Sequence, residues 1–210
     1  AERALRIDAG AATVAQVGAS FPTGGSKWHG GAFAGGKVWG MPYSHARVLR
    51  VDPTSGNASA VGPDLSAFSS RGDSKWWAAV AVGDQVLGIP CSATALLLVD
   101  AVAETVTTFG GPFGGETEKW LGTAQAPGSG VVYALPHDHG RVLRVDVPGG
   151  LAQLIGPDFG TSPAKWRSAV VAGDGRIYGV PYSAQQVLRV DPATDTVSTF
   201  GQVPSGSHKW

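Results

Sequence analysis

The chain has 210 residues, and its 16 Lys and Arg balance 16 Asp and Glu, so it carries no formal net charge. A nucleic-acid-binding protein usually presents a basic face, and this balance argues against that class. The 31 Gly and 14 Pro favour turns and strands over helices. No apolar run approaches the length of a membrane span. The only cysteine, Cys91, has no partner for an internal disulfide.

The chain begins at Ala1 rather than at Met, and no signal peptide is recognisable. This start fits a processed, trimmed or incompletely recorded chain. The sequence leaves the cellular compartment undetermined, with an extracellular or organellar location favoured.

A Lys-Trp pair recurs along the chain, with intervals of 48, 44, 46 and 44 residues. Aligned on this pair, residues 1–26 match the second half of a unit, and residues 209–210 begin a new one. The complete units are residues 27–74, 75–118, 119–164 and 165–208. Repeats of this length are typical of propellers and other repeat architectures.

Each unit contains four short β-like runs, which in the last complete unit are expected at residues 166–172, 176–181, 186–191 and 196–200. The segment "AGDG" at residues 172–175 predicts a tight hairpin turn, and "DPATD" at residues 191–195 predicts a second turn closed by Pro and Asp. No apolar pattern with a period of 3.6 residues is sustained, which argues against helices.

We therefore predict an all-β, single-domain fold over residues 1–210: a β-propeller of four-stranded blades with about five quasi-repeats, four of them complete. Gly and Ala dominate the first run of each unit, as expected for strands crowded around an axis. A parallel β-helix is the alternative, but its coils are shorter. A blade joined from the two chain ends would lack its inner strands. The chain then either continues for about twenty residues beyond Trp210, is completed by another chain, or is a fragment of a larger ring.

The unit "KW…DGRIYGVPYSAQQVLRVDPATDTVSTFG" resembles tandem propeller repeats of uncharacterised families and, more distantly, the blades of streptogramin-lyase and NHL-type propellers. The resemblance covers essentially the whole chain. Similarity to the lyases implies a magnesium-dependent site with a catalytic His. No position of this sequence matches that motif residue by residue, so no catalytic residue is assigned and no cofactor is expected.

The repeated pair suggests an architectural role. Each indole is expected to pack between neighbouring blades, although exposed tryptophans could instead stack on sugars; these residues are Trp28, Trp76, Trp120, Trp166 and Trp210. Strand alternation then directs the lysines to the channel mouth as a possible anion site: Lys27, Lys75, Lys119, Lys165 and Lys209. Alternatively, the lysines form salt bridges with aspartates that recur once per unit, or these aspartates cap turns. The aspartates are Asp8, Asp52, Asp100, Asp146 and Asp191.

A more variable position follows the proline of the second run and is a candidate for contact with a ligand or partner: Tyr43, Cys91, His137 and Tyr182. An unconstrained rim position is the alternative. His137 and His139 flank Asp138, but no third His or Cys has metal-ligand spacing, so no metal site is expected. Asn57 lies in an "NAS" glycosylation sequon, and Arg71–Asp73 form the integrin-recognised tripeptide "RGD".

These features favour a non-enzymatic propeller that presents loops to a protein or carbohydrate partner, either alone or within a homo-oligomer or larger assembly. A sugar-binding lectin is one alternative. A lyase or hydrolase of the streptogramin-lyase-like class is the other, and convergence of His with Glu or Asp in the central mouth would favour it.

Overall fold

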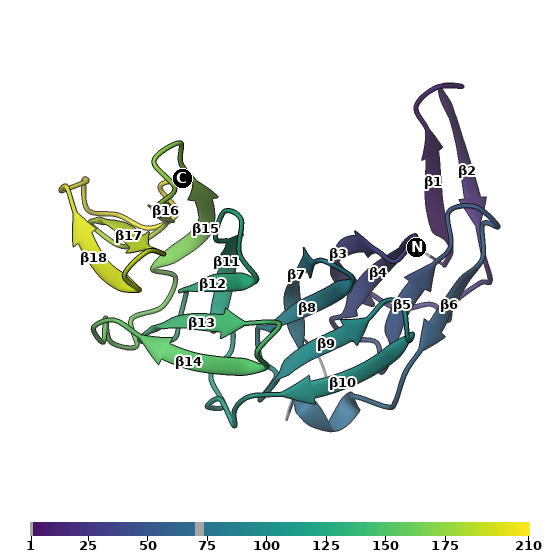
Figure 1. Ribbon diagram of the computed structural model, residues 1–210, viewed down its shortest axis with the longest axis horizontal. Coiled ribbons are helices and arrows are strands. Elements are labelled where there is room, and N and C mark those ends of the chain that lie inside the picture. The colour runs from purple at the N-terminus through teal and green to yellow at the C-terminus, as the bar shows by residue number, and fades with distance from the viewer. Residues whose placement is uncertain (1, 70–73) are drawn as a thin grey trace.

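The computed structural model describes residues 2–69 and 74–210, and these form an open arc of antiparallel sheets (Figure 1). Four sheets have four strands each, and a fifth contains only the hairpin β1–β2. In every four-stranded sheet the strands pair in chain order. This is the predicted all-β propeller with four complete blades, and the arc is not closed into a ring.

The strands of the N-terminal half are β1 (Ala4–Asp8) and β2 (Thr13–Val17) in the hairpin, β3 (Trp28–Ala34), β4 (Lys37–Pro42), β5 (Val48–Val51) and β6 (Ala58–Val61) in blade 1, and β7 (Trp76–Val82), β8 (Gln85–Pro90), β9 (Leu96–Asp100) and β10 (Thr105–Phe109) in blade 2. Those of the C-terminal half are β11 (Trp120–Gln125), β12 (Val131–Pro136), β13 (Val142–Asp146) and β14 (Leu151–Ile155) in blade 3, and β15 (Trp166–Val171), β16 (Ile177–Pro181), β17 (Val187–Asp191) and β18 (Thr196–Phe200) in blade 4. The only helix among the described residues is the 3₁₀ turn η1 (Ser66–Phe68), so no described helix is long enough to span a bilayer.

The inner strands β3, β7, β11 and β15 lie along the concave side of the arc, and the fourth strands lie outside (Figure 1). Small residues allow neighbouring inner strands to touch. A Cβ added to Gly30 would lie 2.5 Å from the Trp77 carbonyl oxygen, and one added to Gly122 would lie 2.7 Å from the Ser168 backbone. The small residues of the first run therefore have the crowding role that the sequence suggested.

The hydrophobic core consists of three clusters, each lying between two neighbouring blades. The first joins blades 1 and 2, the second joins blades 2 and 3, and the third joins blades 3 and 4. Trp76, Trp120 and Trp166 each belong to one of these clusters. Adjacent blades are thus held together mainly by buried apolar area, which is the dominant favourable contribution to folding.

The first strand of every blade contains a bulge, where the register with the second strand shifts by one residue; it comes directly after the repeat tryptophan in blades 2, 3 and 4 and one residue later in blade 1. A bulge of this kind bends the strand and redirects the side chains beside it. It therefore falls on the residue after the tryptophan in blades 2 to 4 and on Gly30 in blade 1.

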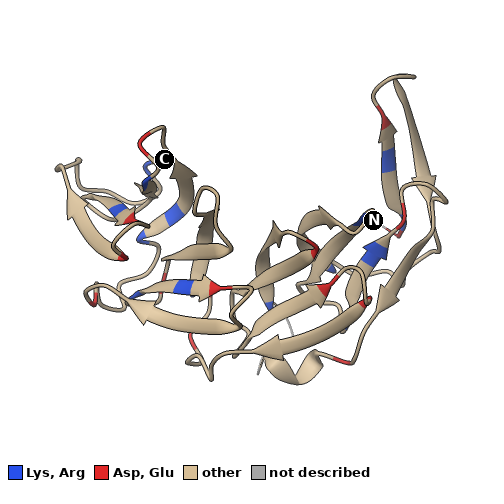
Figure 2. Cartoon of the chain, in the orientation of Figure 1, with Lys and Arg blue, Asp and Glu red and all other residues tan. Residues whose placement is uncertain are grey.

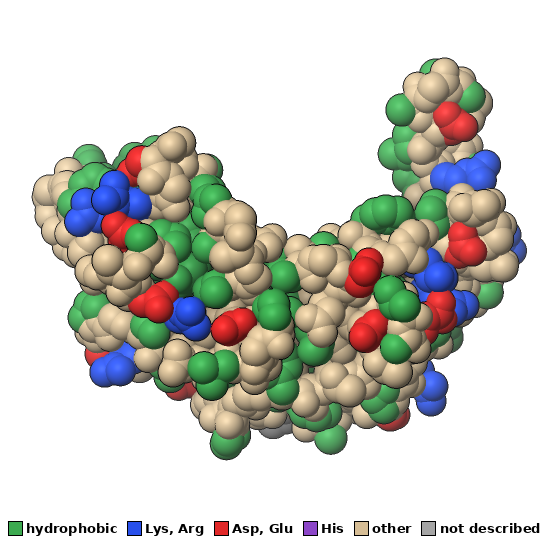
Figure 3. All heavy atoms as spheres, viewed as in Figure 1, with side chains coloured by type: hydrophobic (Ala, Val, Ile, Leu, Met, Phe, Trp, Pro, Cys, Tyr) green, Lys and Arg blue, Asp and Glu red, His purple; other side chains and the backbone are tan. Residues whose placement is uncertain are grey.

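The chain ends lie at opposite sides of the opening (Figure 1). The hairpin β1–β2 projects from the arc and exposes three apolar side chains, those of Leu5, Ile7 and Val14. Hydrophobic atoms are visible along this hairpin in the space-filling view (Figure 3). At the other end, the Lys209 N–H donates to the Tyr182 carbonyl oxygen. Lys75, Lys119 and Lys165 make the equivalent backbone bond to the blade before them.

Candidate functional site

The repeat tryptophans are anchored in the junctions between blades. Trp76 and Trp120 are 0% exposed and Trp166 is 3% exposed, whereas Trp28 is half-buried and Trp210 is 61% exposed. In blades 1 to 4 each indole Nε1–H donates to the carbonyl oxygen of the residue before the third strand. A phenylalanine from the preceding connection packs against each of these indoles. The three buried indoles cannot stack on a sugar from solvent.

The repeat lysines turn into the protein instead of lining a channel. Lys75 and Lys119 are 0% exposed and Lys165 is 5% exposed. Their ammonium groups donate to main-chain carbonyl oxygens: Lys75 to Tyr43, Lys119 to Glu116, and Lys165 to Ser162 and Asp138. Burial lowers the pKa of Lys119 to about 8 and also lowers the pKa of Lys165. This placement differs from the expected anion site, because three of the ammonium groups are not accessible to a dissolved anion.

The repeat aspartates cap the turns that follow the third strands. Their carboxylates accept backbone N–H groups two or three residues further on, as seen for Asp8, Asp52, Asp100, Asp146 and Asp191. Among the described residues, no ion pair joins one of these aspartates to a repeat lysine. Of the two roles considered for the aspartates, the structure shows turn capping. Basic and acidic residues are interspersed along the arc (Figure 2).

The residues after the strand-two prolines lie at one end of the inner strands, where the blade-to-blade connections also arrive. We call this end the mouth. Three repeat positions form it: the residue after the proline, the residue after the repeat tryptophan, and the residue before the repeat lysine.

The backbone at the post-proline position is fixed by two hydrogen bonds that do not depend on its side chain. Its N–H donates to the carbonyl oxygen of the repeat lysine of the same blade, and its carbonyl oxygen accepts the N–H of the next repeat lysine. This pair of bonds occurs at Tyr43, Cys91, His137 and Tyr182. The side chain can therefore vary without disturbing the junction, which explains the variability seen in the sequence.

The residue before each repeat lysine adopts a left-handed conformation although none of the five is glycine. The φ angles are 43° at Ser26, 54° at Ser74, 51° at Glu118, 59° at Ala164 and 57° at His208. Such a conformation is unfavourable for residues with a Cβ atom, and it is common at functional sites. Three of these side chains contact a post-proline residue: Ser74 contacts Tyr43, Glu118 contacts His137, and His208 contacts Tyr182.

A cluster of aromatic rings occupies the mouth between blades 1 and 2. His29 and Trp77 stack with their ring centroids 3.8 Å apart, and Tyr43 lies edge-on to Trp77 at 6.1 Å. The Tyr43 hydroxyl accepts a 2.8 Å hydrogen bond from the Ser74 hydroxyl. His29 is exposed, whereas Trp77 and Tyr43 are half-buried. This cluster therefore brings an indole, an imidazole and a phenol together at the mouth, with the imidazole exposed and the other two rings partly accessible.

A second ring cluster lies at the mouth beside blade 4. The Arg167 guanidinium donates to the Tyr182 hydroxyl at 2.9 Å and its carbon lies 5.0 Å from the centre of the Tyr182 ring. His208 also packs against Tyr182, with the centres of the two rings 4.6 Å apart. Tyr182 is half-buried, and Arg167 and His208 are exposed.

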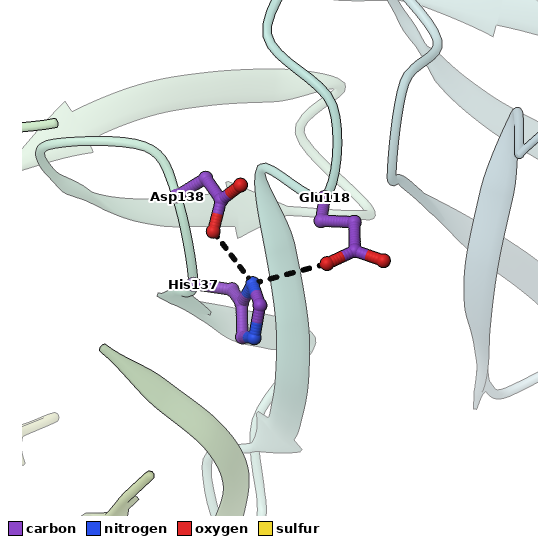
Figure 4. Close-up of side chains that lie close together, drawn as sticks. All are labelled: Glu118, His137 and Asp138. Carbon is purple, nitrogen blue, oxygen red and sulfur yellow. Dashed lines mark ion pairs between the residues drawn. The ribbon is translucent and has the colours of Figure 1, made fainter. Parts of the chain in front are cut away.

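Between the two ring clusters, His137 points between two carboxylates (Figure 4). His137 is 4% exposed, and its Nδ1 lies 2.8 Å from Asp138 Oδ1 and 3.6 Å from Glu118 Oε2. The 2.8 Å contact is not aligned as a hydrogen bond, and Nδ1 has no hydrogen-bond partner among the described residues. Burial lowers the pKa of the imidazole, and the two carboxylates offset part of this effect.

Among the described residues, the other candidates of the sequence belong neither to the ring clusters nor to the group around His137. Cys91 is 0% exposed and burial raises the pKa of its thiol to about 11, so it is not accessible at the mouth. His139 packs on Trp120 with the rings 4.5 Å apart, away from the carboxylates around His137. Asn57 is exposed in the turn between β5 and β6, and its sequon stays a prediction. The "RGD" of Arg71–Asp73 lies outside the described residues.

The resemblance to lyases implied a magnesium site, and the group of Glu118, His137 and Asp138 can be tested for it. Their ligand atoms lie within 4.8 Å of one another. Magnesium prefers six oxygen ligands in an octahedron, usually from carboxylates, phosphates and water. One nearly buried imidazole nitrogen with two carboxylates does not fit this preference, and we assign no reaction step to magnesium.

No protein-family model and no curated protein matches the sequence. Among solved structures, the chain is similar to a catalytically inactive virginiamycin B lyase from Staphylococcus aureus with quinupristin (TM-score 0.68, 11% identity, 95% of this chain and 63% of that chain). It is also similar to a streptogramin B lyase (0.61, 12%, 83% and 54%) and to an auxiliary nutrient binding protein from Bacteroides thetaiotaomicron (0.55, 15%, 87% and 44%). The chain thus spans only part of each of these proteins. At these identities the similarity establishes the propeller fold, including its likeness to streptogramin-lyase propellers, and nothing about activity.

Proposed function

We propose that the protein is a non-enzymatic binding propeller whose mouth binds a carbohydrate. The observation that supports this function is the pair of ring clusters at the mouth, around Trp77 and around Tyr182, each of which includes exposed side chains. Aromatic faces bind the apolar faces of sugar rings, while hydroxyl and guanidinium groups bind their hydroxyls. In this proposal the sugar stacks on Trp77 and not on the repeat tryptophans that the lectin hypothesis first considered.

The mouth also has the features of a prepared site. The post-proline backbone is held on both sides by hydrogen bonds, so Tyr43 and Tyr182 project from fixed positions. A fixed ring loses little conformational entropy when a ligand binds, which improves affinity without adding contacts. The left-handed residues Ser74 and His208 contribute a hydroxyl contact and a ring contact to the same two tyrosines.

A glycan array probed with the labelled protein tests this proposal, followed by calorimetric titration of the best glycan. We expect Trp77→Ala and Tyr182→Ala each to weaken binding roughly 5- to 150-fold, because each removes about 1–3 kcal/mol of ring contact. Tyr178→Ala is the matched control. Tyr178 lies at the opposite end of its blade and bonds Asp174 through its hydroxyl.

A folded protein that binds no glycan on the array would contradict the proposal. So would equal loss of affinity in Tyr182→Ala and Tyr178→Ala, since binding would then depend on blade stability and not on the mouth. Unfolding curves of all variants separate these effects.

A second candidate function is supported by one specific observation. His137, Glu118 and Asp138 converge at the mouth, as a lyase or hydrolase site of this propeller class would require. In that case His137 acts as a general base towards a ligand held by the neighbouring rings. Mass spectrometry of any bound glycan after long incubation distinguishes the two functions: turnover that His137→Gln abolishes while binding persists identifies an enzyme.

A further inference from the structure

We propose that Glu118, His137 and Asp138 bind one divalent transition-metal ion of the Zn²⁺ type at the mouth. This site goes beyond carbohydrate binding and does not require it. The three residues come from two connections of the chain: Glu118 precedes β11, and His137 and Asp138 follow β12 (Figure 4).

The first argument is the direction and burial of the imidazole. The Nδ1 atom of His137 faces the gap between the two carboxylates in Figure 4, and the residue is 4% exposed. A buried polar atom without a hydrogen bond costs free energy. A metal ion in this gap would accept the Nδ1 lone pair and remove that cost.

The second argument is the spacing of the ligand atoms. Two ligands bound at about 2.1 Å to one tetrahedral metal ion lie about 3.4 Å apart. The distance between His137 Nδ1 and Glu118 Oε2 is 3.6 Å, close to this value. The distance to Asp138 Oδ1 is 2.8 Å, so the Asp138 carboxylate must move by about half an ångström or rotate to complete the set.

The third argument is the outer shell of the site. The Ala164 N–H donates to Asp138 Oδ1 at 2.8 Å and keeps that carboxylate beside the imidazole from the next blade connection. Metal-binding carboxylates are usually held by such hydrogen bonds. The Glu118 side chain is 50% exposed, which leaves room for water or a ligand atom in the remaining coordination position.

The donor set selects the class of metal. An imidazole nitrogen suits Zn²⁺ and its neighbours in the transition series, whereas Mg²⁺ and Ca²⁺ prefer an all-oxygen set. The mismatch with magnesium noted above is therefore an indication of which ion the site takes.

The test uses the whole chain without a polyhistidine tag, stripped with a chelator and titrated with ZnCl₂ by calorimetry. A parallel titration with CoCl₂ is followed by visible absorption. We expect one Zn²⁺ per chain, no competition from millimolar Mg²⁺, and affinity at least roughly 10-fold weaker in Glu118→Gln. His137→Gln should lose the site and the cobalt spectrum.

Glu116→Gln is the matched control, because Glu116 is exposed in the same connection but is not part of the cluster. Its affinity should equal that of the unmodified protein. The fold of His137→Gln is checked by its unfolding curve, and Glu118→Gln keeps the proposal testable if that variant is unstable. Absence of stoichiometric Zn²⁺ binding, or equal affinity in Glu118→Gln and Glu116→Gln, would overturn the proposal. No glycan is added, so this result is independent of the proposed carbohydrate site.

Discussion

The side chains at the mouth differ from blade to blade, whereas those of the Lys-Trp layer directly beneath it are the same in every complete blade. Beneath the mouth, the same Lys-Trp pair, the same indole hydrogen bond and a phenylalanine contact recur in every complete blade. At the mouth, equivalent positions carry Tyr, Cys, His and Tyr after the proline, and His, Trp, Leu and Arg after the tryptophan. The difference shows that one layer holds the blades together while the other is free to specialise.

The largest expected effect is the difference in stability loss between two variants, each of which lacks one tryptophan ring, in the lower layer or at the mouth. Trp120→Ala should lower the free energy of unfolding by about 3–5 kcal/mol, because it leaves a cavity between blades 2 and 3. Trp77→Ala at the half-buried mouth should cost less than about 1.5 kcal/mol. Urea unfolding of both variants measures the contrast. Similar losses in the two variants would show that the layers are not energetically distinct.

A smaller effect is expected from pH at the buried lysine of the lower layer. The pKa of Lys119 is about 8 in the folded protein, against an ordinary value of 10.5. Between these values the unfolded chain binds a proton that the folded protein does not, so stability rises with pH. Between pH 8 and pH 10 the gain should be on the order of 2 kcal/mol. Lys119→Met should lack it, and an identical slope in both proteins would show that Lys119 is not the source.

The smallest expected effect concerns the outer rim, where the junctions themselves differ. Arg50 pairs with Glu104 across blades 1 and 2, and Arg144 pairs with Asp195 across blades 3 and 4. The equivalent positions between blades 2 and 3 are Leu98 and Gly150.

Introducing Leu98→Arg and Gly150→Asp together should therefore create a pair with a favourable coupling of about 0.2–1 kcal/mol. The backbone at Gly150 has φ 62°, close to the values of Glu104 and Asp195, and nothing lies within 4 Å of an added Cβ. A double-mutant cycle of unfolding free energies gives the coupling separately from the packing lost with Leu98. A coupling of zero would show that the rim pairs of the other junctions are incidental.

The repeat made most of the fold predictable from sequence. The strands expected in the last complete unit fall within one residue of β15 to β18, because the turn residues and the Lys-Trp frame mark their ends. The direction of the lysines could not be predicted. Strand alternation directed them to the mouth, but the residue before each lysine is left-handed and a bulge follows each tryptophan, so simple alternation does not hold there.

The candidate site was only partly visible in the sequence. The post-proline position was found because it varies among units. Glu118 was missed because it lies in a different connection from His137, 19 residues away, and no local spacing relates them. Trp77 and Arg167 were also missed. Each directly follows a repeat tryptophan, and this shared place in the repeat could have identified them.

The buried lysines donate to main-chain carbonyl oxygens, which every residue possesses, and the next blade is joined through a backbone hydrogen bond as well. The backbone bonds between blades, and the bond from Lys75 to the Tyr43 carbonyl oxygen, therefore do not depend on which side chains the neighbour carries. The apolar clusters between blades are built on the same repeat frame, with one repeat tryptophan in each, so a gene that duplicates a blade also duplicates the surface that its neighbour needs. Each new blade then adds one more set of mouth side chains on which selection can act.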